Sequence, residues 1–187
     1  FWGGGDFMLL IVGRRNEEGR AASRRLLALG LREIWGLEEM PPVERGPMGK
    51  PFFPSMPHIH FNLSHSGDLA LCAFSDQSVG VDIERVRPHR AGLPRYVLSD
   101  REYQWFQTQG GGWEKFCQLW TRKESWVKRT GGSIAGPAKI CPPLPGEQAE
   151  GLLLHDFSGE GWHAAVCAAG PQEYRLLWRD GAEDNKT

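Results

Sequence analysis

The chain has 187 residues and a formal net charge of −1 at pH 7, which argues against bulk electrostatic binding to nucleic acid. Any basic site must therefore be local. The length could bury one sizeable core or two small subdomains, and a hydrophobic share of 40% is ordinary for a globular protein. No apolar run approaches membrane-spanning length and no signal peptide is visible, so we expect neither a nucleic-acid nor a membrane partner.

The cysteines indicate neither a zinc ribbon nor a disulfide framework. They are far apart and form no CxxC pair: Cys72, Cys117, Cys141 and Cys167. We expect reduced, mostly buried thiols and therefore a cytoplasmic protein.

The first half of the chain alternates helix and strand signals. Residues 1–5 resemble a leader more than a folded segment, and Met8 is a candidate natural start. A strand is expected next, and the spacing of leucines then predicts an amphipathic helix over Glu18–Trp35. The remaining elements are a Pro/Gly-rich loop, a strand, a turn and two more strands: 40–57, 58–63, 64–67, 69–74 and 78–83.

The second half begins near Val86 and has a similar make-up. Asp100 is expected to cap a helix over Arg101–Gln107, which three glycines at 110–112 interrupt. A long helix should follow from Trp113 to Arg129, and short strands should fill 140–178. Glu102, in the first turn of its helix, is expected to complement the helix dipole. The predicted fold class is α+β.

One short internal similarity raises the possibility of duplication. The segment 69–74 resembles 163–168 in composition, and a helix precedes each. Any buried strand uses Ala, Val, Leu and Cys, so the similarity could be generic. The alternative is a duplicated α+β unit with pseudo-twofold symmetry.

Two carboxylates stand at the end of the strand after the Ser64–Gly67 turn. Asp82 and Glu84 are two residues apart, so in an extended strand they face the same way. Paired carboxylates are a natural partial shell for Mg2+. The alternative is that they are ordinary acidic residues where a strand enters a loop.

The long helix offers a third carboxylate and a lysine. Trp120, Glu124 and Lys128 are four residues apart and share one helix face. Taken alone, Glu124 and Lys128 could be a solvated ion pair. Together with Asp82 and Glu84, however, they suit metal-assisted phosphoryl transfer.

Four motifs in order resemble those of the 4′-phosphopantetheinyl transferases, particularly the surfactin-synthetase-activator type. They are the GKP loop, the FN-x-SHS turn, the G-x-D-x-E strand end and the W-x-x-KES-x-x-K helix, at 49–51, 61–66, 80–84 and 120–128. The resemblance implies two similar α+β subdomains in pseudo-twofold arrangement with the active site between them. We place these subdomains at residues 8–85 and 86–187.

The resemblance implies a transferase that moves the phosphopantetheine arm of coenzyme A to a carrier-protein serine and releases 3′,5′-ADP. Asp82, Glu84 and Glu124 match the family's metal ligands, for Mg2+ or Mn2+. Lys128 matches the lysine that approaches the pyrophosphate. Glu124, directly or through a metal-bound water, is the candidate base for the serine hydroxyl.

The resemblance also implies a set of residues that hold coenzyme A. Ser64 and His65 match the SHS turn that contacts its phosphates, and Lys50 and Arg24 match basic residues at the adenosine end, with Arg25 a competitor for Arg24. Ser64 and His65 could instead be a nucleophile and its base, but adjacent residues rarely face each other as that chemistry requires.

The implied partner is an apo acyl, peptidyl or aryl carrier domain, and the sequence does not distinguish among these. Two other functions stay open. One is a different metal-dependent nucleotide pyrophosphatase or phosphotransferase, and the other is a catalytically weak carrier-binding module. A pseudo-symmetric pair of subdomains would satisfy its own interface, so we expect a monomer.

Overall fold

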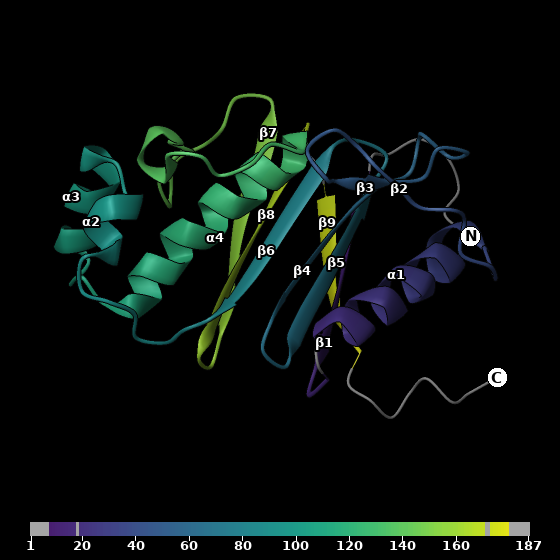
Figure 1. Cartoon of the computed structure of the whole chain (residues 1–187), viewed down its shortest axis with the longest axis horizontal. Coiled ribbons are helices and arrows are strands. Elements are labelled where there is room, and N and C mark those ends of the chain that lie inside the picture. Colours follow the sequence, from purple (N-terminus) through teal and green to yellow (C-terminus); the bar gives the residue numbers. More distant parts are fainter. Residues whose placement is uncertain (1–7, 18, 171–172, 180–187) are drawn as a thin grey trace.

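Two β-sheets lie side by side at the centre of the protein, and one long helix covers the outer flank of each (Figure 1). The structure is a computed structural model that describes residues 8–17, 19–170 and 173–179. The leader expected at 1–5 and the expected first helical residue, Glu18, lie outside these ranges. Among the described residues, no helix is both long and apolar enough to cross a membrane.

The first sheet has the strand order β4-β5-β1-β9. Its members are β1 (Met8–Arg15), β4 (His60–Ser66), β5 (Leu69–Ser75) and β9 (Glu173–Trp178). Neighbours run antiparallel except β1 and β9, which are parallel. Helix α1 (Gly19–Trp35) covers one face because its leucines recur at helical spacing. Leu26 and Leu31 pack there against Phe61 and Phe74.

The second sheet has the order β6-β8-β7, with all neighbours antiparallel. Its strands are β6 (Val79–Arg85), β7 (Leu152–Gly159) and β8 (Trp162–Ala169), and α4 (Trp113–Thr130) covers its outer face. Gly80 lets the helix approach closely, since a Cβ there would lie 2.1 Å from the carbonyl oxygen of Ser125. Gly131 ends α4 with a φ of 76°.

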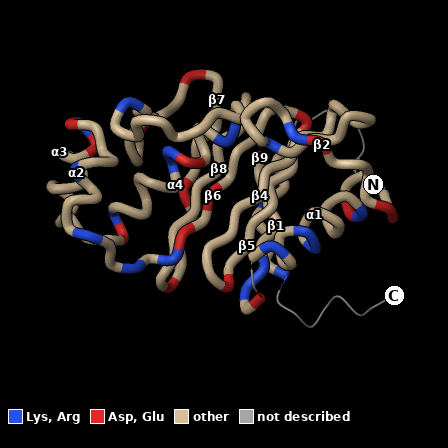
Figure 2. The backbone as a smooth tube through the Cα atoms, in the orientation of Figure 1, with Lys and Arg blue, Asp and Glu red and all other residues tan. Residues whose placement is uncertain are grey.

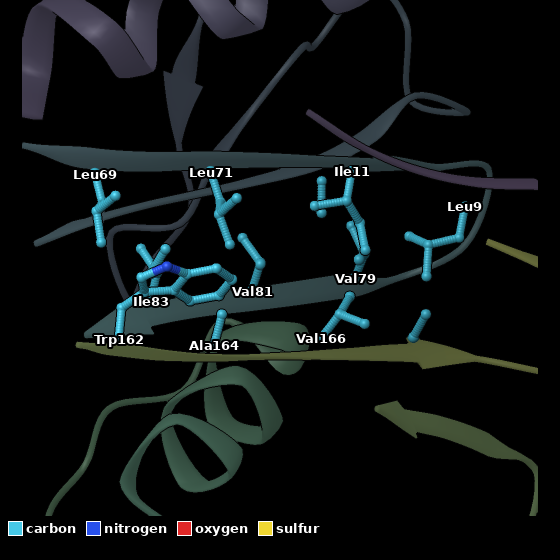
Figure 3. Packing of buried hydrophobic residues seen from close by; sticks show 12 residues of the cluster. Leu9, Ile11, Leu69, Leu71, Val79, Val81, Ile83, Trp162, Ala164 and Val166 are labelled. Atoms are coloured by element: carbon cyan, nitrogen blue, oxygen red, sulfur yellow. The ribbon is translucent and has the colours of Figure 1, made fainter. Parts of the chain in front are cut away.

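The inner faces of the two sheets share one core (Figure 3). Val79, Val81 and Ile83 of β6 are fully buried in it, facing β1 and β5 of the other sheet beside residues of β8. Because side chains alternate along a strand, Gly80, Asp82 and Glu84 point to the opposite side of β6, where α4 lies. The predicted period-two pattern at 80–84 therefore sets which residues reach the helix.

The short elements lie at the ends of the sheets. They are β2 (Glu44–Arg45), β3 (Pro51–Phe52), α2 (Leu93–Val97), α3 (Asp100–Thr108) and a 3-10 helix, η1 (Pro137–Lys139). Ser99, not Asp100, caps α3: its hydroxyl accepts from the Glu102 backbone N–H, and the Glu102 carboxylate accepts from the Ser99 N–H. Glu102 does more than complement the dipole, because it is buried and pairs with Lys123 at 2.6 Å.

Two further sequence-based expectations differ from the structure in detail. The expected turn at Ser64–Gly67 is a strand as far as Ser66, because Ser64 and Ser66 pair with β5, and the chain turns only at Gly67. The boundary at 85/86 does not coincide with the limits of the sheets. β6, placed before it, pairs with β8, and β9, placed after it, pairs with β1. The mixture of helices and largely antiparallel strands agrees with the expected mixed α and β class.

Candidate functional site

Side chains of β4, rather than its backbone, join the first sheet to the second. Asn62, Ser64 and Ser66 each accept a hydrogen bond from an alternate backbone N–H of β6, those of Val81, Ile83 and Arg85, at 2.8, 3.3 and 3.1 Å. The three acceptors are alternate residues of an extended strand, so they lie on one side of β4. Sequence reasoning missed Asn62 and Ser66, although the alternating Asn-x-Ser-x-Ser pattern was visible.

Asp82 lies at this junction and is 3% exposed. Its Oδ1 accepts from the Ser64 hydroxyl at 2.7 Å and from the Lys128 ammonium at 2.6 Å. Among the described residues, its Oδ2 is buried without a hydrogen-bond partner. Burial raises the pKa of Asp82, and the ammonium of Lys128 opposes that rise.

Glu84 and Glu124 complete a group of three carboxylates. Glu84 Oε2 accepts from the Ser66 hydroxyl at 2.7 Å. Glu124 is one turn before Lys128 on α4, and burial, helped by the negative charges of Asp82 and Glu84, raises its pKa to about 7. Asp82 and Glu84 therefore lie close enough to Glu124 to disfavour its ionised form.

The ligand types in this group suit a divalent cation, although the three carboxylates do not converge on one point. Within the described ranges, no three possible ligands are close enough together to hold a metal ion as they stand. Carboxylate oxygens are nevertheless the ligands that Mg2+ prefers. The unpartnered Oδ2 of Asp82 and the raised pKa of Glu124 both indicate negative charge that the protein leaves uncompensated. The Lys128 ammonium offsets part of it.

Lys50 lies apart from the carboxylates and is held by backbone. Its ammonium donates to the carbonyls of Val79 and Arg129, at 2.8 and 2.7 Å, which ties the loop before β3 to β6 and α4. Burial, with the nearby charge of Arg129, lowers the pKa of Lys50 to about 8. The residue lines a hollow of ≈ 680 Å³, together with Met48, Phe53 and His60.

His65 and Arg24 lie on the α1 side of the first sheet. His65 is exposed on the face of β4 opposite Ser64, and its imidazole abuts the start of α1 so closely that a Cβ on Gly19 would lie 2.8 Å from Nδ1. Arg24 is exposed on α1, where basic positions gather along the outer flank (Figure 2), while its competitor Arg25 pairs with Glu17 at 3.0 Å. Ser64 gives its proton to Asp82, so it forms no nucleophile pair with His65.

The structure thus brings five of the predicted site residues to one junction: Ser64, Asp82, Glu84, Glu124 and Lys128. The other predicted site residues, Arg24, Lys50 and His65, lie elsewhere. A small cavity of ≈ 170 Å³ adjoins this junction at Glu84, and its apolar walls include Leu93, Phe116 and Trp120. No sequence pattern had pointed to it.

Comparisons with known proteins agree on one family. The family model of the 4′-phosphopantetheinyl transferase superfamily matches residues 78–176. The 4′-phosphopantetheinyl transferase Sfp of Bacillus subtilis is 31% identical over 136 residues, which cover 66% of this chain and 61% of that protein. The 4′-phosphopantetheinyl transferase psf-1 of Bacillus pumilus is 35% identical over 174 residues, 91% of this chain and 70% of that one.

A further relative is matched over a similar share of both chains. The 4′-phosphopantetheinyl transferase AcpT of Salmonella typhimurium is 38% identical over 140 residues, or 72% of this chain and 71% of that protein. The chain spans about three fifths of the length of the Bacillus subtilis relatives, with matches covering 61% of each. These matches confirm the resemblance that the four motifs had predicted.

Proposed function

Because the chain belongs to the 4′-phosphopantetheinyl transferase superfamily, we propose that it transfers the phosphopantetheine arm of coenzyme A to a serine hydroxyl of an apo carrier protein. The second product is 3′,5′-ADP. One observation carries the proposal: Lys128 lies 2.6 Å from Asp82, and burial together with the charges of Asp82 and Glu84 raises the pKa of Glu124. An ammonium beside an excess of carboxylates suits a pyrophosphate that shares a divalent cation with the protein.

Asp82, Glu84 and Glu124 are the residues that would hold this cation, Mg2+ or Mn2+, because they supply hard oxygen ligands and uncompensated negative charge. When bound, such a cation polarises the pyrophosphate and offsets the charge that develops on the departing nucleotide.

The roles of the protein's own groups follow from their charge states. Glu124, with its pKa near 7, accepts the proton of the serine hydroxyl, directly or through water. The serine oxygen then forms a bond to the β-phosphorus, and the bond from that phosphorus to the ADP oxygen breaks with its electron pair on ADP. Lys128 donates to the phosphate oxygens and stabilises the leaving group.

The groups proposed to hold coenzyme A are spread over a wider area than the three carboxylates. Lys50 borders the hollow of ≈ 680 Å³, although two of its three N–H groups are already used by backbone carbonyls. His65 and Arg24 offer hydrogen bonds and positive charge on the α1 side. Ser64 could contact a phosphate only by exchanging its bond to Asp82.

The strand order supports a duplicated, pseudo-twofold arrangement with the active site between its units. In the first unit, β1, α1 and the β4–β5 hairpin give the order β4-β5-β1. In the second unit, β6, α4 and the β7–β8 hairpin give β7-β8-β6. The similar segments 69–74 and 163–168 occupy equivalent strands, β5 and β8, so we place the division before β6 rather than at 85/86.

The remaining expectations stay predictions. The partner is an acyl, peptidyl or aryl carrier domain, with no nucleic acid or membrane involved. The protein is expected to act as a monomer in the cytoplasm.

Product analysis separates the proposal from its two alternatives. The protein is incubated with coenzyme A and Mg2+, with and without an apo carrier, and released 3′,5′-ADP is quantified by chromatography. The transferase predicts release that requires the carrier. Equal release without the carrier would instead support a pyrophosphatase, and no release in either case would support a carrier-binding module.

A further inference from the structure

Ser66, the last residue of β4, holds two consecutive residues of β6. It is 8% exposed, its hydroxyl donates to Glu84 Oε2 at 2.7 Å, and its oxygen accepts from the backbone N–H of Arg85 at 3.1 Å. One serine of the first sheet therefore fixes both a side chain and the backbone of the second sheet.

The direction of these two bonds is determined by the available protons. A hydroxyl has one proton and two lone pairs, and a backbone N–H can only donate. The backbone N–H of Arg85 therefore donates to a lone pair of the Ser66 oxygen, which leaves the hydroxyl proton for the carboxylate of Glu84. The hydroxyl therefore holds one oxygen of the Glu84 carboxylate in a fixed position beside β4.

The same pattern occurs two residues earlier on both β4 and β6. Ser64 donates to Asp82, 18 residues on, and accepts from the N–H of Ile83, 19 residues on. Ser66 repeats these separations with Glu84 and Arg85. Because the offset between β4 and β6 is the same in both cases, each serine holds the carboxylate that lies beside it.

We propose that Ser66 is a positioning residue that fixes the Glu84 carboxylate for divalent-cation binding, an inference that rests on the metal site of the proposed function. Glu84 has three rotatable side-chain bonds and is only partly buried. Without the serine, binding a cation must also order this carboxylate, which weakens affinity. Loss of such an outer partner typically costs about 10- to 100-fold in metal affinity.

The test measures cation binding directly on the full chain, without coenzyme A or carrier. Free Mn2+ is quantified by electron paramagnetic resonance during titration of the parent, Ser66→Ala and Ser66→Thr, which keeps the hydroxyl. Ser23→Ala is the matched control, since Ser23 is a buried serine whose hydroxyl donates to the Gly19 carbonyl on α1. Thermal unfolding of every variant is recorded in parallel.

The proposal predicts that Ser66→Ala weakens Mn2+ binding at least about 10-fold, while Ser66→Thr and Ser23→Ala stay within about 3-fold of the parent. In a Glu84→Gln background, Ser66→Ala should have no further effect. If Ser66→Ala does not fold, Ser66→Cys replaces it, because a thiol is a weak donor of similar size and should also weaken binding.

Unchanged Mn2+ affinity in Ser66→Ala, or an equal loss in the Glu84→Gln background, would overturn the inference. A parent that binds no Mn2+ would overturn both it and the metal site. A parent that binds Mn2+ but transfers nothing to a carrier would refute the proposed function alone, and the binding results would still decide the role of Ser66.

Discussion

Gly80 is the position where the packing of α4 on β6 can be tested most sharply. A Cβ at Gly80 would lie 2.1 Å from the carbonyl oxygen of Ser125 and 2.4 Å from the backbone nitrogen of Arg129, both within the last two turns of α4. Ordinary contact begins near 3.4 Å, so in Gly80→Ala the helix must withdraw by roughly 1 Å, and backbone atoms cannot rotate out of the way.

Two effects of Gly80→Ala follow from this displacement. Overpacking against backbone should lower the free energy of unfolding by about 3 kcal/mol, the upper end for such changes. Moving α4 also moves Lys128 and Glu124 away from Asp82, and a displacement near 1 Å typically costs about 100-fold in rate. Urea denaturation measures the first effect, and initial rates of carrier modification measure the second.

The control is Gly92→Ala, since Gly92 has a φ of −76° and no atom within 4 Å of an added Cβ. We expect its stability to change by no more than about 0.5 kcal/mol. If Gly80→Ala unfolds and reacts like the parent, α4 does not pack directly on the β6 backbone, and the reasoning is wrong.

Three further predictions concern the charged groups. Lys128→Met removes the cation beside buried Asp82, so the free energy of unfolding at pH 7 should fall by about 1–3 kcal/mol in urea titrations; an unchanged midpoint would contradict the pairing. Glu124 has a folded-state pKa raised to about 7, so between pH 4.5 and 7 the folded state binds more protons than the unfolded state. The loss of stability from its buried negative charge is therefore fully present only above pH 7. Glu124→Gln should therefore stabilise the protein by about 1 kcal/mol at pH 8, a value discounted for partial exposure, and should have no effect at pH 4; the same gain at both pH values would refute the assignment. Lys50→Met leaves the carbonyls of Val79 and Arg129 without their donor, so thermal and urea unfolding should show a loss of about 1–3 kcal/mol, and no loss would contradict its structural role.

The sequence was sufficient where the geometry of the candidate site depends on local periodicity. Alternation placed Asp82 and Glu84 on one side of a strand, and four-residue spacing placed Glu124 and Lys128 on one helix face. It was insufficient where the partner lies far along the chain. The segment from Ser64 to Gly67 suggested a turn because serine and glycine favour one locally, yet backbone pairing with β5 made Ser64 and Ser66 part of a strand.

Long-range partners also explain the other differences. The sequence suggested a domain boundary at the end of β6. The sheet to which β6 belongs depends, however, on its pairing with β8, which lies about 80 residues further along the chain and has no local sequence signal. Lys123 is fully buried, because Glu102 of α3 and the carbonyls of Pro137 and Ile140 surround its ammonium. None of these three partners could be paired with Lys123 from sequence spacing alone.

The intact mass of an apo carrier protein tests the central claim most directly. After incubation with coenzyme A, Mg2+ and the full chain, the carrier should gain the mass of one phosphopantetheine group, and with Glu124→Gln it should gain none. A carrier left unmodified by the parent, or modified equally by Glu124→Gln, would contradict the assignment of transfer to the Asp82, Glu84, Glu124 and Lys128 group.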